Sequence, residues 1–261
     1  RLVVNMSTSE QARNLAPLRT EFRALQSLEL WGICDFEHIN LVAPAHGVKA
    51  LLLDFFDHET TFKRPFTTPI FDKPWSRNLT TLSLYDMPPV SREWAQSLPP
   101  CLAHLIINHP FNPSEPQPEV DYLENLPASL TFLQLIGVAA LQDSHLAQLP
   151  RRLLRASIYV EQSALPSSRF TSDGISKLPP LLCDFESDVP LYSIPPVHPD
   201  TWLPPCIERL DLWRPEKKDA QEATTEGTND PEDSEDENYS WDYLQLCLYH
   251  RATQQDVGYW D

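Results

Sequence analysis

Glycine is scarce in this chain: the sequence contains 6 glycines in 261 residues. They form no glycine-rich phosphate loop, no dinucleotide-binding fingerprint and no nucleophile elbow. No histidine pair has the H-E-x-x-H spacing of a zinc peptidase. The sequence therefore offers no candidate catalytic, cofactor-binding or metal-ligating residue, and we expect a protein that is not an enzyme.

The cysteines and the hydrophobic runs also give no indication of a metal site, a disulfide framework or a membrane span. The five cysteines are dispersed, without a C-x-x-C pair, which argues against both a disulfide framework and a zinc site. The closest histidine pair, His104 and His109, has no nearby cysteine or third ligand. No apolar run approaches membrane-spanning length and no signal peptide is visible. We expect a cytoplasmic or nuclear protein that is not bound to a membrane.

Positive charge is also in short supply. The chain has 20 Lys and Arg residues against 37 Asp and Glu residues, a net charge of −17, which argues against nucleic acid as a partner. Ten acidic residues and two lysines lie between Glu216 and Glu237. An acidic stretch with few apolar residues is typical of disorder. We therefore expect an acidic disordered insertion over residues 214–240.

The chain does contain a repeated pattern, L-x-x-L-x-L. Its clearest copy is Leu130/Leu133/Leu135, and the first positions of eight copies are separated by 23, 31, 23, 28, 23, 29 and 25 residues, a mean of 26. This is the periodicity of a stacked-repeat architecture. The other copies are Leu25/Leu28/Leu30, Val48/Leu51/Leu53, Leu79/Leu82/Leu84, Leu102/Leu105/Ile107, Leu153/Ala156/Ile158, Leu182/Phe185/Ser187 and Ile207/Leu210/Leu212.

The pattern predicts a parallel sheet. Its last two apolar positions alternate with one polar residue, as in a strand with one buried face, and stacked copies would bury that face in one core. Five copies are also preceded by Leu-Pro, with each proline three residues before the first apolar position: 98–99, 126–127, 149–150, 178–179 and 203–204. Proline ends a helix or fixes a turn. The predicted strands are 25–31, 48–54, 79–85, 102–108, 130–136, 153–159, 182–188 and 207–213.

The predicted fold class is α/β: a leucine-rich-repeat solenoid with a curved parallel sheet on its concave face, and short helices and irregular proline-rich connectors on its convex face. Residues 1–213 would form about eight repeats, beginning in the middle of a repeat. Residues 241–261 would form the last repeat and the C-terminal end, because Tyr243/Leu246/Leu248 restores the pattern. The helical predictions are 91–97, 119–125 and 139–148.

The candidate binding residues follow from strand geometry, since alternate side chains should point to the concave face. In the eight copies, the residue that follows the last apolar position of the pattern is Trp31, Asp54, Tyr85, Asn108, Ile136, Tyr159, Asp188 and Trp213. Aromatic side chains in such a row are typical of interface anchors, although they could instead pack under a loop or cap the sheet edge. Asp184, Glu186 and Asp188 form an acidic stripe beside Arg155 and Arg209, either a solvated charge set or a contact for a basic partner. The predicted partner-binding residues are Trp31, Tyr85, Phe132, Arg155, Tyr159, Asp184, Glu186, Asp188, Arg209 and Trp213.

With these motifs the chain resembles the leucine-rich-repeat superfamily over residues 1–213, and again at 241–249. The irregular repeats with Leu-Pro are similar to those of fungal F-box and leucine-rich-repeat proteins, while residues 98–112 resemble one FNIP repeat of amoebae. The usual asparagine after the strand is missing except at Asn108, which indicates a divergent lineage.

The resemblance implies a non-enzymatic protein–protein interaction module, in which the concave face recognises substrates for an F-box-type ubiquitin ligase. The sequence contains no F-box, so contact with a cullin adaptor would depend on a region outside it. The alternative is an acidic scaffold or histone-chaperone-like binder of basic proteins, because repeats with an acidic run also resemble acidic leucine-rich nuclear phosphoproteins.

Overall fold

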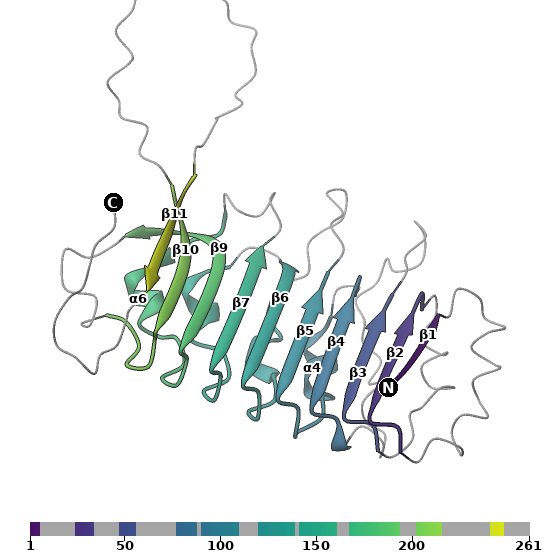
Figure 1. Cartoon of the computed structure of the whole chain (residues 1–261). Coiled ribbons are helices and arrows are strands. Elements are labelled where there is room, and N and C mark those ends of the chain that lie inside the picture. Colours follow the sequence, from purple (N-terminus) through teal and green to yellow (C-terminus); the bar gives the residue numbers. More distant parts are fainter. Residues whose placement is uncertain are drawn as a thin grey trace, which may run out of the picture.

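The computed structural model describes ten segments of the chain, and Figure 1 shows how they are arranged. For Ser193, residues 213–215 and residues 241–247 it describes the backbone. The remainder of the predicted acidic insertion, residues 216–240, lies outside the described segments, as does the end of the chain after residue 247. The segments are 1–5, 24–33, 47–55, 77–87, 90–109, 120–138, 141–160, 167–193, 202–215 and 241–247.

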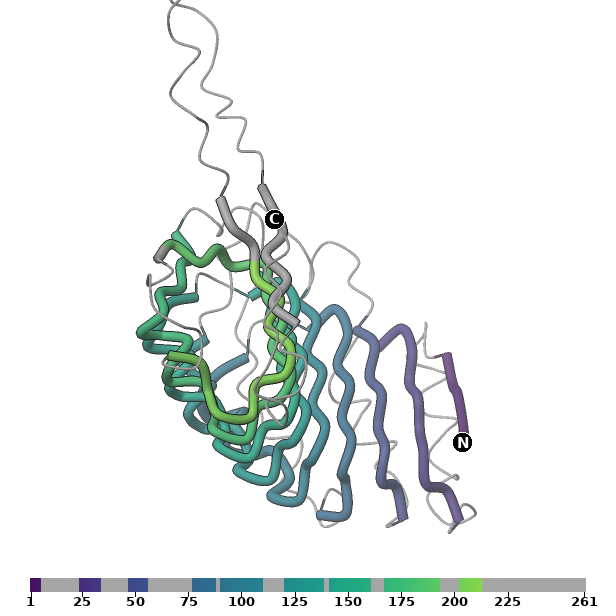
Figure 2. The backbone as a smooth tube through the Cα atoms, turned by 60° about the vertical axis from the view of Figure 1, so that its left-hand side comes forward, coloured from purple at the N-terminus to yellow at the C-terminus, as the bar shows by residue number. Residues whose placement is uncertain are grey.

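The described strands form one 11-stranded sheet whose strand order follows the sequence. Neighbours from β1 to β10 are parallel, and the short β8 lies off the main path, paired with the end of β9. The predicted α/β repeat solenoid is thus confirmed, and Figure 2 shows its coils stacked side by side. The strands are β1 (Leu2–Asn5), β2 (Ser27–Trp31), β3 (Ala50–Asp54), β4 (Thr81–Tyr85), β5 (His104–Asn108), β6 (Phe132–Val138), β7 (Arg155–Val160), β8 (Phe170–Thr171), β9 (Asp184–Ser193), β10 (Arg209–Pro215) and β11 (Trp241–Cys247).

The register of the sheet is the one that the repeats predict. Leu105 pairs with Leu82 on one side and with Leu133 on the other, and all three side chains are fully buried. Burying a leucine side chain contributes about 1.5–3 kcal/mol, so this ladder is a large part of the stabilising energy. A second ladder joins the last core positions of the copies, from Leu135 through Ile158 to Ser187, its polar member. The Ser187 Oγ donates to the Ile158 carbonyl at 2.7 Å, which satisfies its buried hydroxyl.

Each of the five Leu-Pro motifs forms the same turn before its strand. The proline carbonyl accepts a hydrogen bond from the N–H three residues later, for example Leu130 N to Pro127 O at 3.1 Å. The leucine of each motif is buried, and Leu126 retains 7% exposure. The motif therefore supplies both a turn and a core residue.

Helices in the described segments are short and lie behind the sheet in the view of Figure 1. They are α4 (Arg92–Gln96), η2 (Leu123–Asn125), α5 (Asp143–Leu146) and α6 (Ser172–Ile175). Ser91 caps α4, accepting from the Trp94 N–H at 3.2 Å, in agreement with the helix predicted at 91–97.

The helix predicted over 139–148 is wrong at its start. Leu141 N donates to Ser168 Oγ at 3.1 Å, and Gln142 forms a parallel bridge with Arg169. These contacts hold the chain extended, so that α5 begins at Asp143. The helical turn predicted at 119–125 is reduced to the 3-10 turn η2 at its end.

Residues 241–247 form a strand as predicted, but β11 runs antiparallel to β10, with Leu246 opposite Leu210. A further parallel repeat would require a crossover behind the sheet. β11 is instead the second arm of a hairpin with β10, and in this respect the predicted last repeat differs from the structure.

Successive coils alternate in form. β2, β4 and β6 are each interrupted or followed by a residue with positive φ, at Gly32 (73°), Asp86 (51°) and Gly137 (71°). The intervening strands β3, β5 and β7 lack this extra residue before the next buried position. The coils that begin at β2, β4 and β6 are also the 23-residue ones, and the coils between them span 28–31 residues. The structural unit up to β9 is therefore a pair of coils.

Candidate functional site

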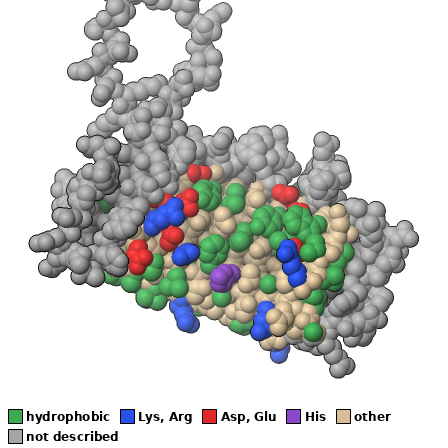
Figure 3. All heavy atoms as spheres, viewed as in Figure 1, with side chains coloured by type: hydrophobic (Ala, Val, Ile, Leu, Met, Phe, Trp, Pro, Cys, Tyr) green, Lys and Arg blue, Asp and Glu red, His purple; other side chains and the backbone are tan. Residues whose placement is uncertain are grey.

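The open face of the sheet carries the candidate binding residues. In β2 to β7, side chains that point into the core alternate with partly or fully exposed ones. Figure 3 shows this face, with hydrophobic side chains over the central strands, a cluster of charged side chains toward β9 and β10, and further charged side chains toward the N-terminal strands. Two regions with different chemistry are thus placed side by side on one surface.

The predicted aromatic residues lie on this face at the expected strand positions. Trp31, at the end of β2, is the most exposed of those described, at 39%; Tyr85 and Tyr159 are partly exposed at the ends of β4 and β7. The Trp213 backbone lies opposite Tyr243 of β11. Phe132 lies at the other end of its strand, so the aromatic residues are distributed over the face rather than in one row.

An apolar patch occupies the middle of the face on β5 and β6. We define it as Ile106, Phe132 and Ile136, all partly exposed. The Phe132 ring stacks on the His104 ring, with centroids 5.7 Å apart and planes at 24°. In the register, Ile106 pairs with Gln134, which stands between Phe132 and Ile136 on the same strand. The three apolar side chains therefore adjoin across two strands.

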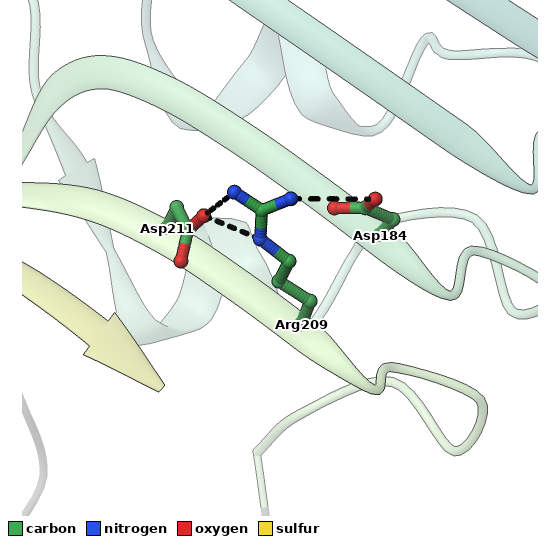
Figure 4. Close-up of polar contacts among 3 residues, drawn as sticks. All are labelled: Asp184, Arg209 and Asp211. Atoms are coloured by element: carbon green, nitrogen blue, oxygen red, sulfur yellow. Dashed lines mark hydrogen bonds and ion pairs between the residues drawn. The ribbon is translucent and has the colours of Figure 1, made fainter. Parts of the chain in front are cut away.

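Arg209 is the centre of the charged region (Figure 4). Its Nε donates to Asp211 Oδ2 at 2.6 Å, a second guanidinium nitrogen contacts the same oxygen, and Asp184 Oδ2 lies 4.0 Å from a third nitrogen. The Asp211 side chain is fully buried, whereas that of Arg209 is 45% exposed. The hydrogen bond from Arg209 satisfies Oδ2 of the buried carboxylate, whereas Oδ1 has no hydrogen-bond partner in the described segments.

The acidic stripe divides into residues with different roles. Asp188 Oδ1 accepts from the Val160 N–H at 2.9 Å, so this carboxylate satisfies the backbone at the end of β7. Burial raises the pKa of Asp188 to about 6, although the Val160 N–H opposes the shift. Burial also raises the pKa of Asp184, and the nearby Arg209 and Arg155 offset part of that rise.

Among the acidic stripe and the two arginines beside it, the side chains of Glu186 and Arg155 form neither a hydrogen bond nor an ion pair in the described segments. Glu186 is partly exposed near the start of β9, between Ser157 and Asp211 in the register. Arg155 is exposed on β7, next to Phe132 and Asp184. Both side chains are thus accessible for contacts with another molecule.

Sequence reasoning missed two features of this surface. The first is the pairing of Arg209 with the buried Asp211. The Arg209-x-Asp211 spacing could have suggested this pairing, because residues two apart on a strand share a face. The second is a carboxylate pair: burial raises the pKa of Asp54, and the Asp86 charge adds to the shift. Asp86 occupies the extra positive-φ position, which L-x-x-L-x-L does not contain.

His104 and His109 lie on different sides of the sheet. His104 is exposed on the open face, whereas His109 is 3% exposed and packs into the core row that continues β5. Its Nδ1 lies 2.7 Å from the Met87 carbonyl, which can only accept, so Nδ1 carries the proton. Burial lowers the pKa of His109 to about 4, partly opposed by this hydrogen bond. The two rings therefore cannot share a ligand.

Together the fold and this surface define an α/β repeat solenoid with one half-exposed sheet face. No protein family matches the chain, and no curated protein matches it at a significant level. In the described segments no helix is long and apolar enough to cross a membrane.

Proposed function

We propose that the chain is a non-enzymatic protein-interaction module whose partner binds across the open face of the sheet. The observation that supports this most directly is the set of aromatic and aliphatic side chains left partly exposed across this face, with Trp31 at 39%. Water-exposed surfaces rarely gather such side chains unless another molecule covers them. A cytoplasmic or nuclear protein partner, rather than nucleic acid or a membrane, fits the net charge of −17.

The specific role that we propose is substrate recognition in an F-box-type ubiquitin ligase. It rests on the similarity of the irregular Leu-Pro repeats to those of fungal F-box and leucine-rich-repeat proteins. In this role the open face holds the substrate, and contact with a cullin adaptor would be made by a segment other than the repeats.

The alternative is an acidic scaffold, or a histone-chaperone-like binder of basic proteins. The unpaired Glu186 on the open face and the ten acidic residues between 216 and 237 favour it. Such binding would be largely electrostatic and would weaken steeply as salt concentration rises.

Affinity purification of the tagged full-length protein from its source cells, followed by quantitative mass spectrometry, separates these functions. The face variant is the double substitution Trp31→Ala and Tyr85→Ala. The matched control is Tyr192→Ala, an exposed tyrosine (54%) in the part of β9 near its pairing with β8. We expect the face variant to lose co-purifying proteins that the control retains.

The identity of the proteins that are lost then decides the role. A cullin adaptor that co-purifies with both variants, together with substrates lost from the face variant, supports the ligase role. Histones or other basic proteins that disappear at moderate salt, or on deletion of 216–240, support the acidic scaffold. Identical profiles for the face variant and the wild type would contradict binding at this face.

A further inference from the structure

We expect the partner of the open face to carry two particular side chains. The apolar patch determines the first of these, a large apolar side chain. Ile106, Phe132 and Ile136 lie on adjacent strands, partly exposed, with the His104 ring stacked on Phe132. Such a cluster gains most from burial against one large apolar side chain.

The charged region determines the second. Apart from Asp86, which follows β4 beside Asp54, the open face of the described segments has three basic and six acidic side chains, an excess of three negative charges; they are Arg1, Arg155, Arg209, Glu29, Asp54, Asp184, Glu186, Asp188 and Asp211. Arg1 pairs with Glu29 at 2.7 Å, and Arg209 with Asp211. Glu186 keeps a carboxylate without an ion pair, with Asp184 two residues before it on the same face of β9. Arg209 lies 4.0 Å from Asp184 and also feels the charge of Glu186, but the four stripe carboxylates, Asp211 included, outnumber Arg209 and Arg155. This position favours a cation.

The spacing of the two regions sets the spacing on the partner. β6 and β9 are separated by β7 alone. Adjacent strands lie about 4.8 Å apart, so the apolar patch and Glu186 are about 10 Å apart across the sheet. A segment in the extended polyproline II conformation rises about 3.1 Å per residue with three residues per turn, so side chains three positions apart point to the same side and lie about 9 Å apart. Between the two regions, β7 presents Ser157 level with Glu186 and Arg155 level with Phe132 and Asp184, and Arg155 would repel a basic side chain.

We propose that the open face binds an extended protein segment that crosses the strands and carries a large apolar residue about three positions from a lysine or arginine. In this proposal, which rests on the proposed function, the apolar residue covers Ile106, Phe132 and Ile136, and the cation binds Glu186 with Asp184 beside it. The intervening positions are neutral or acidic because they face Arg155.

A library of random linear peptides displayed on phage, panned at low ionic strength against the purified full chain, tests the proposal. The first variant is Glu186→Lys, which reverses the charge at the cation site. Its matched control is Asp121→Lys, which makes the same change at an exposed residue just before η2 on the connector side. The second variant is Ile106→Asp in the apolar patch, and urea unfolding of each variant verifies that it is folded.

We expect peptides enriched on the wild type to combine an apolar residue with Lys or Arg at the stated spacing. They should bind Glu186→Lys at least about tenfold more weakly, and Asp121→Lys unchanged. Panning against Glu186→Lys should select Asp or Glu at the former basic position, a gain that misfolding cannot produce. Peptides that require Ile106 but show no basic preference would overturn this inference and leave the proposed function standing. Peptide binding that ignores both substitutions would overturn both.

Discussion

The carbonyl oxygen of His109 occupies the place where a side chain at position 137 would begin. A Cβ atom on Gly137 would lie 2.7 Å from that oxygen, and the residue has φ of +71°. The same segment is tied down, because His109 N donates to the Ile136 carbonyl at 2.9 Å. Glycine at 137 therefore allows the bulge in β6 to pass the end of β5.

Replacing Gly137 with alanine should lower the free energy of unfolding by about 2 kcal/mol or more, because it combines left-handed strain with a backbone clash. Urea unfolding measures the change. Ser157→Ala, on the open face, is the control and should alter stability by less than about 0.5 kcal/mol. Equal stability of the two variants would show that β6 does not contain this bulge.

Leu133→Ala should cost about 2–5 kcal/mol, since Leu133 is fully buried in the ladder between Leu105 and Ala156 and leaves a cavity when truncated. The same unfolding experiment on Gln134→Ala, the next residue and partly exposed, should show little change. Similar losses at both positions would contradict the alternation of core and open face.

Acid should destabilise the protein through His109. Its pKa is about 4 in the folded chain against 6.5 ordinarily, so the unfolded state binds more protons between these values. The stability that the protein gains by burying a neutral His109 is fully present above pH 6.5 and is lost as the pH falls toward 4. The loss amounts to at most about 3 kcal/mol. We expect His109→Leu to remove this loss, so that the stability difference between variant and wild type shifts in favour of the variant as pH falls. Urea unfolding at several pH values measures it, and a difference independent of pH would refute the assignment.

Asp188 should have the opposite effect. Its pKa is raised to about 6 from 3.8, so the folded state binds more protons in this window, and the stabilisation present below pH 3.8 is lost as pH rises through 6. Because the carboxyl is partly exposed, the effect should be about 1 kcal/mol. Asp188→Asn keeps an acceptor for the Val160 N–H and should therefore be more stable than the wild type at pH above 7. Thermal unfolding at high and low pH would show this gain disappearing in acid; a gain of equal size at both would point to a cause other than ionisation.

The sequence predicted the strands of the sheet and their register closely, because each coil repeats a local pattern. The Leu130/Leu133/Leu135 spacing places the same three side chains inward in every copy, and neighbouring copies match residue for residue. The prediction of α4 succeeded for a similar reason, since Ser91 is a local cap. The residues of the open face were predicted from the alternation of buried and exposed positions along each strand.

Other features depended on contacts that no local pattern contains. α5 begins late because Gln142 pairs with Arg169 in the following coil. The row of buried residues at or just after the strand ends, such as Val138 and Met87, was missed because a positive-φ residue shifts it by one position in alternate coils. A fixed six-residue pattern cannot describe an insertion that appears in every second copy.

By itself the sequence determined the stacked coils, their register and the residues that share the open face, because hydrophobic periodicity acts within each repeat and adds up over neighbours. The tertiary structure decided what those residues do. It turned β11 antiparallel, buried Asp211 against Arg209, assigned Asp188 to the backbone of β7 and left Glu186 unpaired among the described residues. Residues from different coils make most of these contacts, and their distances are fixed only when the sheet has formed.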